Sequence, residues 1–168
     1  MSGRIFLLGD DIDTDQLAPG QYMKGGVEML AAHCLETARP DFAGSVKPGD
    51  VIVAGKNFGM GSSREQAAEA LKHLGVAGVV ARSFAGIFYR NAINLGLPVL
   101  IAGNLDAVAD GDAVVLDIVA GELRLTDKTQ TVRLEPLPDN LKRMLADGGL
   151  VPHLKKRFAE ERAKEAGA

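Results

Sequence analysis

Residues 51–102 read VIVAGKNFGMGSSREQAAEALKHLGVAGVVARSFAGIFYRNAINLGLPVLIA, and they contain the pattern that decides the fold. Short apolar runs alternate there with segments whose apolar residues recur at helical spacing. The apolar runs lie at 51–54, 78–81 and 98–102, and the helical segments at 63–74 and 84–95. Strands joined through a helix run parallel, and the helices then cover the sheet. The segment therefore predicts the centre of an α/β fold.

The chain adds one strand before this segment and an antiparallel region after it. Residues 4–8 form a further apolar run, followed by a polar loop at 9–26 and an amphipathic helical pattern at 27–39. Further strands are expected at 113–119, 122–126 and 131–134, and helices at 141–145 and 154–166. We predict one domain over residues 1–168, with a mixed, mainly parallel sheet, an antiparallel C-terminal patch and a solvated terminal helix at 154–168.

The composition excludes several classes of function. The net charge is -3 and aromatic residues make up 5%, so neither a basic field nor a base-stacking surface is expected for nucleic acid. The apolar runs are too short for a signal peptide or a spanning helix, so we expect no membrane contact and a cytoplasmic location. The single cysteine, Cys34, cannot form an internal disulfide, and its place on an apolar helical stripe predicts a core residue.

The most informative motif is the glycine-rich stretch GMGSSRE at 59–65. Backbone N–H groups between Gly61 and a following helix start would form a concave anion site, where Arg64 could hold a carboxylate with two parallel hydrogen bonds. The same stretch fits a capping box, with Ser62 as N-cap and Glu65 reaching back. Spacing alone leaves these two alternatives equal. No Gly-Lys-Ser/Thr closes the stretch, so it is not a Walker A motif.

A second motif is the acidic stretch DDIDTD at 10–15. Gln16 and Tyr22 stand where a calcium loop needs a glycine and a bidentate glutamate, so calcium is rejected. Two interpretations stay open: a turn whose carboxylates cap their own backbone, and a carboxylate that supports a basic group in a site. No histidine is paired with Cys34 at a metal-ligand spacing, so no metal site is expected in this chain.

Together these motifs resemble a known family. The residues that carry the resemblance are DTD at 13–15, GKNFGMGSSRE at 55–65, SFA at 83–85, IF at 87–88, Asn91, Asn94 and GLP at 96–98. From its first strand to about residue 154, the chain resembles the small subunit of 3-isopropylmalate dehydratase, the free-standing swivel domain of the aconitase superfamily.

This resemblance implies a swivelling β/β/α fold and a hydro-lyase of leucine biosynthesis. It also implies a large partner subunit that carries a [4Fe–4S] cluster, with a hydroxy di- or tricarboxylic acid as substrate. The cysteine count agrees with this division, because a cluster needs several thiolates and this chain has only one cysteine.

The resemblance further assigns roles to individual residues. Ser62 would be the base that takes the proton from carbon in dehydration and returns it in hydration. Ser63 and Arg64 would bind a substrate carboxylate, with Asp15 and Gly61 in support. The pKa of an alcohol, like that of water, lies far above neutral pH, so a serine alkoxide needs strong stabilisation in a dry interface. We therefore expect no dehydratase activity from this chain alone.

Two features leave the substrate open. Many members of the family have histidine where this chain has Gln66, an amide that cannot gain charge. The loop that resembles the family's substrate selector reads QYMKGG at 21–26, with Tyr22 and Lys24 as candidate substrate contacts. Apolar Met23 suits the isopropyl group of isopropylmalate, whereas Lys24 suits the extra carboxylate of homoaconitate.

The alternatives at this point are three. The chain is the small subunit of an isopropylmalate isomerase, the small subunit of homoaconitase or a related hydroxyacid dehydratase, or a stand-alone anion-binding module. For the isolated chain, a homo-oligomer is a further expectation.

Overall fold

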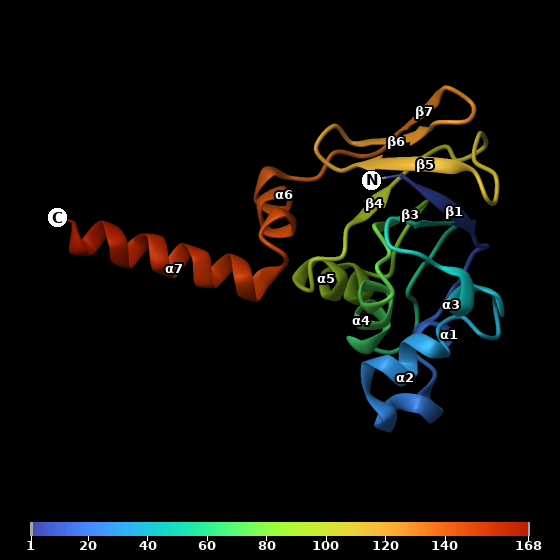
Figure 1. The fold of residues 1–168 in the computed structure, drawn as a ribbon, viewed down its shortest axis with the longest axis horizontal. Coiled ribbons are helices and arrows are strands. Elements are labelled where there is room, and N and C mark those ends of the chain that lie inside the picture. Colours follow the sequence, from blue (N-terminus) through green and yellow to red (C-terminus); the bar gives the residue numbers. More distant parts are fainter. Residues whose placement is uncertain (1, 168) are drawn as a thin grey trace.

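The computed structural model describes residues 2–167, which are built on a seven-stranded sheet (Figure 1). The strands follow the order β4-β3-β2-β1-β5-β6-β7 across the sheet. Their bounds are β1 Gly3–Leu7, β2 Val51–Ala54, β3 Gly78–Ala81, β4 Val99–Ile101, β5 Ala113–Asp117, β6 Glu122–Leu125 and β7 Gln130–Arg133. β1 to β4 pair in parallel, and β5 to β7 extend the sheet from β1 in antiparallel pairs. The predicted mixed α/β fold is confirmed, with parallel pairs forming half of the sheet rather than most of it.

The helices connect the parallel strands or follow the antiparallel ones. They are α1 Thr14–Leu17, the 3₁₀ helix η1 Gly20–Gly25, α2 Gly26–Ala32, α3 Phe42–Ser45, α4 Gln66–His73, α5 Gly86–Asn94, α6 Asp139–Ala146 and α7 Leu150–Ala166. α4 lies between β2 and β3 in the chain, and α5 lies between β3 and β4. Both are crossovers of the kind that parallel neighbours require.

The central parallel strands, β2 and β3, are buried on both faces because two different layers cover them. All residues of β2 and β3 are buried. Successive side chains of a strand point to opposite faces. Accordingly, Ile52 and Val79 belong to the core under the helices, whereas Val53 and Val80 share a second core with Val114 of the antiparallel strands. Figure 1 shows β5 to β7 on one side of the parallel strands and α4 and α5 on the other. These are the β/β/α layers expected from the resemblance.

Several element boundaries differ from the predictions made from periodicity, most clearly those of α2, α4 and α5. α4 begins at Gln66 rather than at 63, and α5 at Gly86 rather than at 84. α2 ends at Ala32 rather than at 39, because the chain turns to bury Leu35 completely. Leu35 adopts a φ of 61°, and its N–H donates to the carbonyl of Gln16 at 2.8 Å. The apolar stripe at 27–39 therefore reflects core packing beyond the end of the helix.

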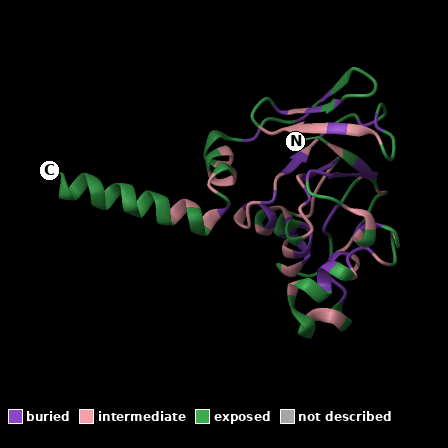
Figure 2. Ribbon diagram, viewed as in Figure 1, coloured by how far each residue is buried: buried purple, intermediate pink, exposed green. Residues whose placement is uncertain are grey.

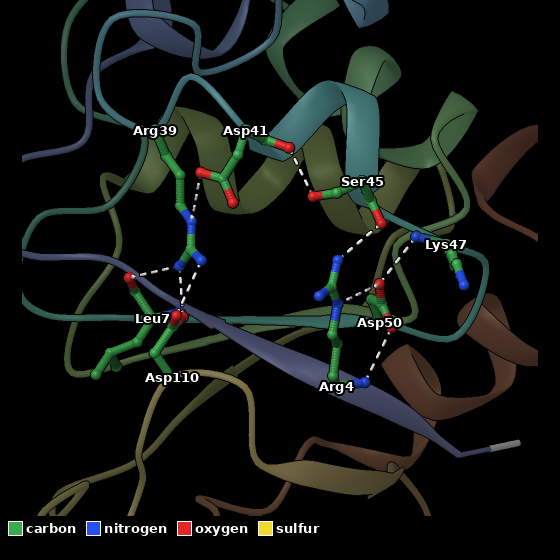
Figure 3. A network of polar contacts seen from close by, with 8 residues as sticks. All are labelled: Arg4, Leu7, Arg39, Asp41, Ser45, Lys47, Asp50 and Asp110. Atoms are coloured by element: carbon green, nitrogen blue, oxygen red, sulfur yellow. Dashed lines mark hydrogen bonds and ion pairs between the residues drawn. The ribbon is translucent and has the colours of Figure 1, made fainter.

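A network of charged residues holds the segment after α2 against β1 (Figure 3). The guanidinium carbons of Arg4 and Arg39 lie 4.7 and 4.8 Å from the centre of the Phe6 ring. Asp50, which is 4% exposed, accepts the backbone N–H of Arg4 at 2.9 Å. Arg39 donates from Nη2 to Asp110 Oδ2 at 2.9 Å and from Nη1 to the other carboxylate oxygen. Distant segments are thus fixed to the first strand on which the site is built.

The C-terminal helix α7 runs away from the body of the molecule and is exposed over most of its length (Figure 2). It begins at Leu150, four residues before the charged segment from which a terminal helix at 154–166 was predicted. Of the helices in residues 2–167, none combines the length and the apolar character needed to span a bilayer.

Candidate substrate-binding site

The candidate site lies where the chain leaves the carboxyl ends of β1 and β2. The loop after β1 and the loop after β2 hydrogen bond to each other through their backbones. The N–H of Gly59 donates to the carbonyl of Ile12 at 2.7 Å, and the N–H of Thr14 donates to the carbonyl of Met60 at 2.8 Å. Because these bonds continue the β1–β2 pairing beyond the strands, the acidic motif and the glycine-rich motif form one unit.

Glycines allow the close approach of these two loops. Gly59 has a φ of +83°, and a Cβ there would lie 2.2 Å from the Phe88 ring. Gly61 has a φ of +108°, and a Cβ there would lie 3.0 Å from Thr14 Oγ1. A side chain at either position would strain the backbone, and it would clash with Phe88 of α5 at position 59 or push the two loops apart at position 61. Gly61 is therefore placed so that Ser62 can meet Thr14.

Ser62 is exposed on the outer side of this unit and contacts Thr14 through two atoms. Its backbone N–H donates to Thr14 Oγ1 at 3.1 Å, and its Oγ lies 3.2 Å from the same oxygen. Thr14 is only 3% exposed. The Ser62 hydroxyl is thus fixed from the protein side and open on the other side. Ser63 is also exposed.

Arg64 is paired with Asp15 across the two loops. Arg64 Nη1 donates to Asp15 Oδ1 at 2.7 Å and to the carbonyl of Ala18 at 3.1 Å. The Arg64 guanidinium, helped by the N–H of Gly20, holds the pKa of Asp15 below its usual range. Within residues 2–167, both hydrogen bonds of Arg64 start from Nη1. A guanidinium carries five N–H groups, so those on Nη2 and Nε are left for a ligand.

The alternative in which Ser62 caps a helix is wrong. α4 begins at Gln66 with Glu65 at its N-cap position, and no side chain caps it. The capping box is found instead at α1, where Asp13 accepts the N–H of Gln16 at 2.8 Å and Gln16 accepts the N–H of Asp13 at 2.9 Å. Asp13 therefore fits the interpretation of a self-capping turn, while Asp15 fits that of a carboxylate supporting a basic group.

The two candidate substrate contacts of the selector loop, Tyr22 and Lys24, lie on η1, next to this pair. A Cβ at Gly20, the first residue of η1, would lie 3.5 Å from Arg64 Nη2. The Tyr22 ring stacks on the His33 ring, with centroids 3.6 Å apart and planes 8° apart. Lys24 is exposed, whereas Met23 packs against the core under the helices. The structure thus brings η1 to the guanidinium, and no contact of Tyr22 or Lys24 with Ser62 is recorded in residues 2–167.

Two residues of this region, Thr14 and His33, were not predicted from the sequence. Thr14 lay inside the acidic motif without an assigned role, although its position directly after the Asp13 N-cap marks it as the first residue of a helix. His33 had no assigned role because its ring stacks on Tyr22 of a different element, and such a contact leaves no pattern in the local sequence. Cys34 is completely buried as predicted, and burial raises the pKa of its thiol. Among residues 2–167, no group of three His, Cys, Asp or Glu side chains is arranged to hold a metal ion.

Comparison with known proteins agrees with this architecture. The family described as the aconitase C-terminal domain matches residues 29–103. A methanogen homoaconitase small subunit from Methanothermobacter thermautotrophicus is 51% identical over 152 residues, which cover 90% of this chain and 88% of that protein. A 3-isopropylmalate dehydratase small subunit from Archaeoglobus fulgidus is 50% identical over 158 residues, covering 93% of this chain and 95% of that protein.

A solved structure is similar over nearly the whole chain. The crystal structure of 3-isopropylmalate dehydratase from Methanocaldococcus jannaschii matches with a TM-score of 0.91 and 48% identity, covering 97% of this chain and 98% of that chain. The layered fold is therefore that of an aconitase-type C-terminal domain. Within that class, the chain belongs to the family of 3-isopropylmalate dehydratase small subunits, in which some relatives are named homoaconitase small subunits. The resemblance inferred from the motifs is confirmed.

Proposed function

We propose that this chain is the small subunit of a hydro-lyase that interconverts 2-isopropylmalate and 3-isopropylmalate by dehydration and rehydration. The observation that carries the proposal is the paired-loop unit, in which an open hydroxyl of Ser62 stands two residues from a guanidinium with free N–H groups. Relatives at 45–51% identity named 3-isopropylmalate dehydratase small subunit support the choice of reaction. We also propose that residues 1–168 form one swivel domain.

The proposed roles follow from what each side chain can do. Arg64 holds a substrate carboxylate through Nη2 and Nε, while Asp15 keeps the guanidinium in place through Nη1. Ser63, exposed beside it, adds a hydroxyl donor to the same carboxylate. Ser62 takes the proton from the carbon next to a carboxylate in dehydration, and returns a proton to carbon in rehydration. Gly61 lets the loop approach Thr14 closely enough to fix Ser62.

An iron–sulfur cluster does not fit the residues of this chain. Its one cysteine, Cys34, is fully buried in the core under the helices, and its thiol has a raised pKa. A thiolate ligand would need the opposite environment. We propose that a large partner subunit carries the [4Fe–4S] cluster and closes the open side of the site. The two subunits together form the active enzyme.

A second candidate differs only in substrate. Lys24 is exposed at the end of η1, the helix that begins beside Arg64, and an ammonium there would favour an extra carboxylate over an isopropyl group. Some relatives are named methanogen homoaconitase small subunit. This observation favours homoaconitase as the alternative function.

The test is reconstitution with the iron–sulfur large subunit and a panel of acids containing 3-isopropylmalate, homoaconitate and citrate. We expect turnover only in the mixture of both subunits, with the highest kcat/KM on 3-isopropylmalate. A higher kcat/KM on homoaconitate would support the second candidate. No turnover on any of the acids, with an anion still bound by the chain alone, would support a stand-alone anion-binding module instead.

A further inference from the structure

Thr14 is one of two polar residues that are buried within residues 2–167, the other being Asp50. Asp50 accepts backbone N–H groups in the network around β1. Among residues 2–167, no hydrogen bond joins Thr14 to that network. Its hydroxyl is directed at Ser62, 48 residues further along the chain, and its 3% exposure separates it from solvent. A buried hydroxyl needs its hydrogen-bond capacity filled, so the partners of Thr14 Oγ1 determine what it does.

The direction of the hydrogen bond between the two hydroxyls follows from the donors and acceptors available to Thr14 Oγ1. Thr14 Oγ1 already accepts the backbone N–H of Ser62 at 3.1 Å. It still has one proton to donate, and within residues 2–167 the acceptor recorded in reach is Ser62 Oγ at 3.2 Å. If Ser62 donated instead, the proton of the buried Thr14 hydroxyl would be left without a partner, which is unfavourable.

We infer that Thr14 is a positioning residue. Its hydroxyl donates a hydrogen bond to Ser62 Oγ and stabilises the Ser62 oxygen when Ser62 is deprotonated. The inference rests on the proposed function, in which Ser62 acts as the base. Donation to Ser62 Oγ leaves the Ser62 proton free to point outward. When that proton has left, the bond becomes a charge-assisted O–H···O⁻ bond, which is shorter and roughly twice as strong as a neutral one.

The surrounding backbone keeps the Thr14 hydroxyl aimed at Ser62. The Thr14 N–H is bonded to the Met60 carbonyl at 2.8 Å, and the capping box of Asp13 fixes the start of α1 directly before it. Gly61 leaves just enough room, because a Cβ there would lie 3.0 Å from Thr14 Oγ1. Such a donor is arranged before the reaction, so it needs no reorganisation when charge develops on Ser62.

The test compares Thr14→Val, Thr14→Ala and Thr14→Ser in the complex with the large subunit. Removal of one prearranged donor to an oxyanion lowers kcat by about 10²–10³-fold in other enzymes, and we expect a loss of this order for Thr14→Val and Thr14→Ala. KM should change little, because Thr14 does not contact the carboxylate site at Arg64. Thr14→Ser keeps the hydroxyl and should restore kcat to within about tenfold of wild type.

A combination with Ser62→Ala separates action through Ser62 from a general structural effect. In the Ser62→Ala background the acceptor oxygen is gone, so Thr14→Val should lower the residual rate by less than about twofold. Thr126→Val, at an exposed threonine in the antiparallel region, is the matched control, and it should leave both constants unchanged. Thermal unfolding of each variant shows whether the chain still folds.

Each outcome decides the inference. Wild-type kcat in Thr14→Val or Thr14→Ala would overturn it. A rise in KM at unchanged kcat would assign Thr14 to loop structure, and so would a full loss of activity in Thr14→Ser. If Thr14→Val does not fold, Thr14→Ala and Thr14→Ser still give the comparison. A wild-type complex without turnover on any acid would instead refute the proposed function, and the inference with it.

Discussion

Replacing Arg64 by lysine keeps the positive charge but removes the planar group that can make two parallel hydrogen bonds to a carboxylate. Among residues 2–167, one nitrogen, Nη1, makes both hydrogen bonds of the guanidinium to the protein, at 2.7 Å to Asp15 and 3.1 Å to the Ala18 carbonyl. Nη2 and Nε are thereby free for a carboxylate. A lysine has a single nitrogen, so its ammonium must divide its donors between Asp15 and the substrate.

The magnitude of the effect follows from the bonds lost. A bidentate carboxylate contact falls to at most one hydrogen bond, and losing one charge-assisted bond costs about 1.5–3 kcal/mol. This corresponds to a loss of roughly 10- to 150-fold in affinity. The Asp15–Arg64 pair is itself largely exposed, at 69% for the Asp15 side chain, so the free energy of unfolding should change by less than about 1 kcal/mol.

The assay is steady-state kinetics of the reconstituted complex over a range of 3-isopropylmalate concentrations, together with urea unfolding of the chain. We expect a raised KM and a reduced kcat/KM in Arg64→Lys with nearly unchanged stability. Arg157→Lys, on the exposed helix α7, is the matched control and should be silent. Unchanged KM and kcat in Arg64→Lys would remove Arg64 from the substrate site and refute the argument.

Three further predictions concern the base, the selector and the charged network. Ser62→Ala should lower kcat of the complex by orders of magnitude. The free energy of unfolding of the chain should change by only about 1 kcal/mol, because Ser62 is exposed and caps no helix. Near-normal turnover would refute the role of Ser62 as base. Lys24→Leu should shift the ratio of kcat/KM values toward isopropylmalate by about tenfold or more, and an unchanged ratio would show that Lys24 points to solvent. Arg39 lowers the pKa of Asp110, so this pair stabilises the fold above the unfolded pKa of 3.8, and the stabilisation is lost as pH falls through the lower folded pKa. At pH 7, Asp110→Asn should therefore lower the free energy of unfolding measured in urea by at most about 1 kcal/mol, since the Asp110 side chain is half exposed. The difference should shrink as the pH falls below 3.8 and vanish once the pH is below the folded pKa of Asp110. A difference that persists at low pH would contradict this linkage.

Much of the fold could be predicted because the buried strands are short, continuous apolar stretches of the sequence. β2 and β3 are buried at every position, so their apolar runs stood out without knowledge of their neighbours. The attachment of the antiparallel strands could not be predicted, because β5 pairs with β1 across more than 100 residues, Gly3 opposite Val114. Such a pairing depends on tertiary packing and leaves no local pattern.

The predicted element boundaries were wrong where tertiary contacts override the local preference of the sequence. The stretch before α4 has the spacing of a capping box, yet the hydrogen bonds of its loop to Ile12 and Thr14 hold Ser62 away from the helix. The true capping box, of Asp13 and Gln16, did have a local signal, since an N-cap aspartate is followed three residues later by glutamine. It was hidden because the acidic residues around it suggested a turn or a cation loop.

The way the site is built argues for a division of work between two chains. The bonds from Gly59 to Ile12 and from Thr14 to Met60 extend the parallel pairing of β1 and β2, so Ser62 and Arg64 are held on a continuation of the sheet before any partner binds. Crevices beyond the carboxyl ends of such strands are the usual ligand sites of α/β sheets. Yet the Ser62 side chain is exposed, and in water the pKa of an alcohol lies far above neutral pH. The prearranged donors reduce this gap, but each pKa unit requires about 1.36 kcal/mol, and hydrogen bonds to charge contribute only about 1.5–3 kcal/mol each. On the proposed function, the remainder comes from the exclusion of water when the large subunit closes over the loops. This chain would then position the base, and the assembled complex would make it strong enough to act.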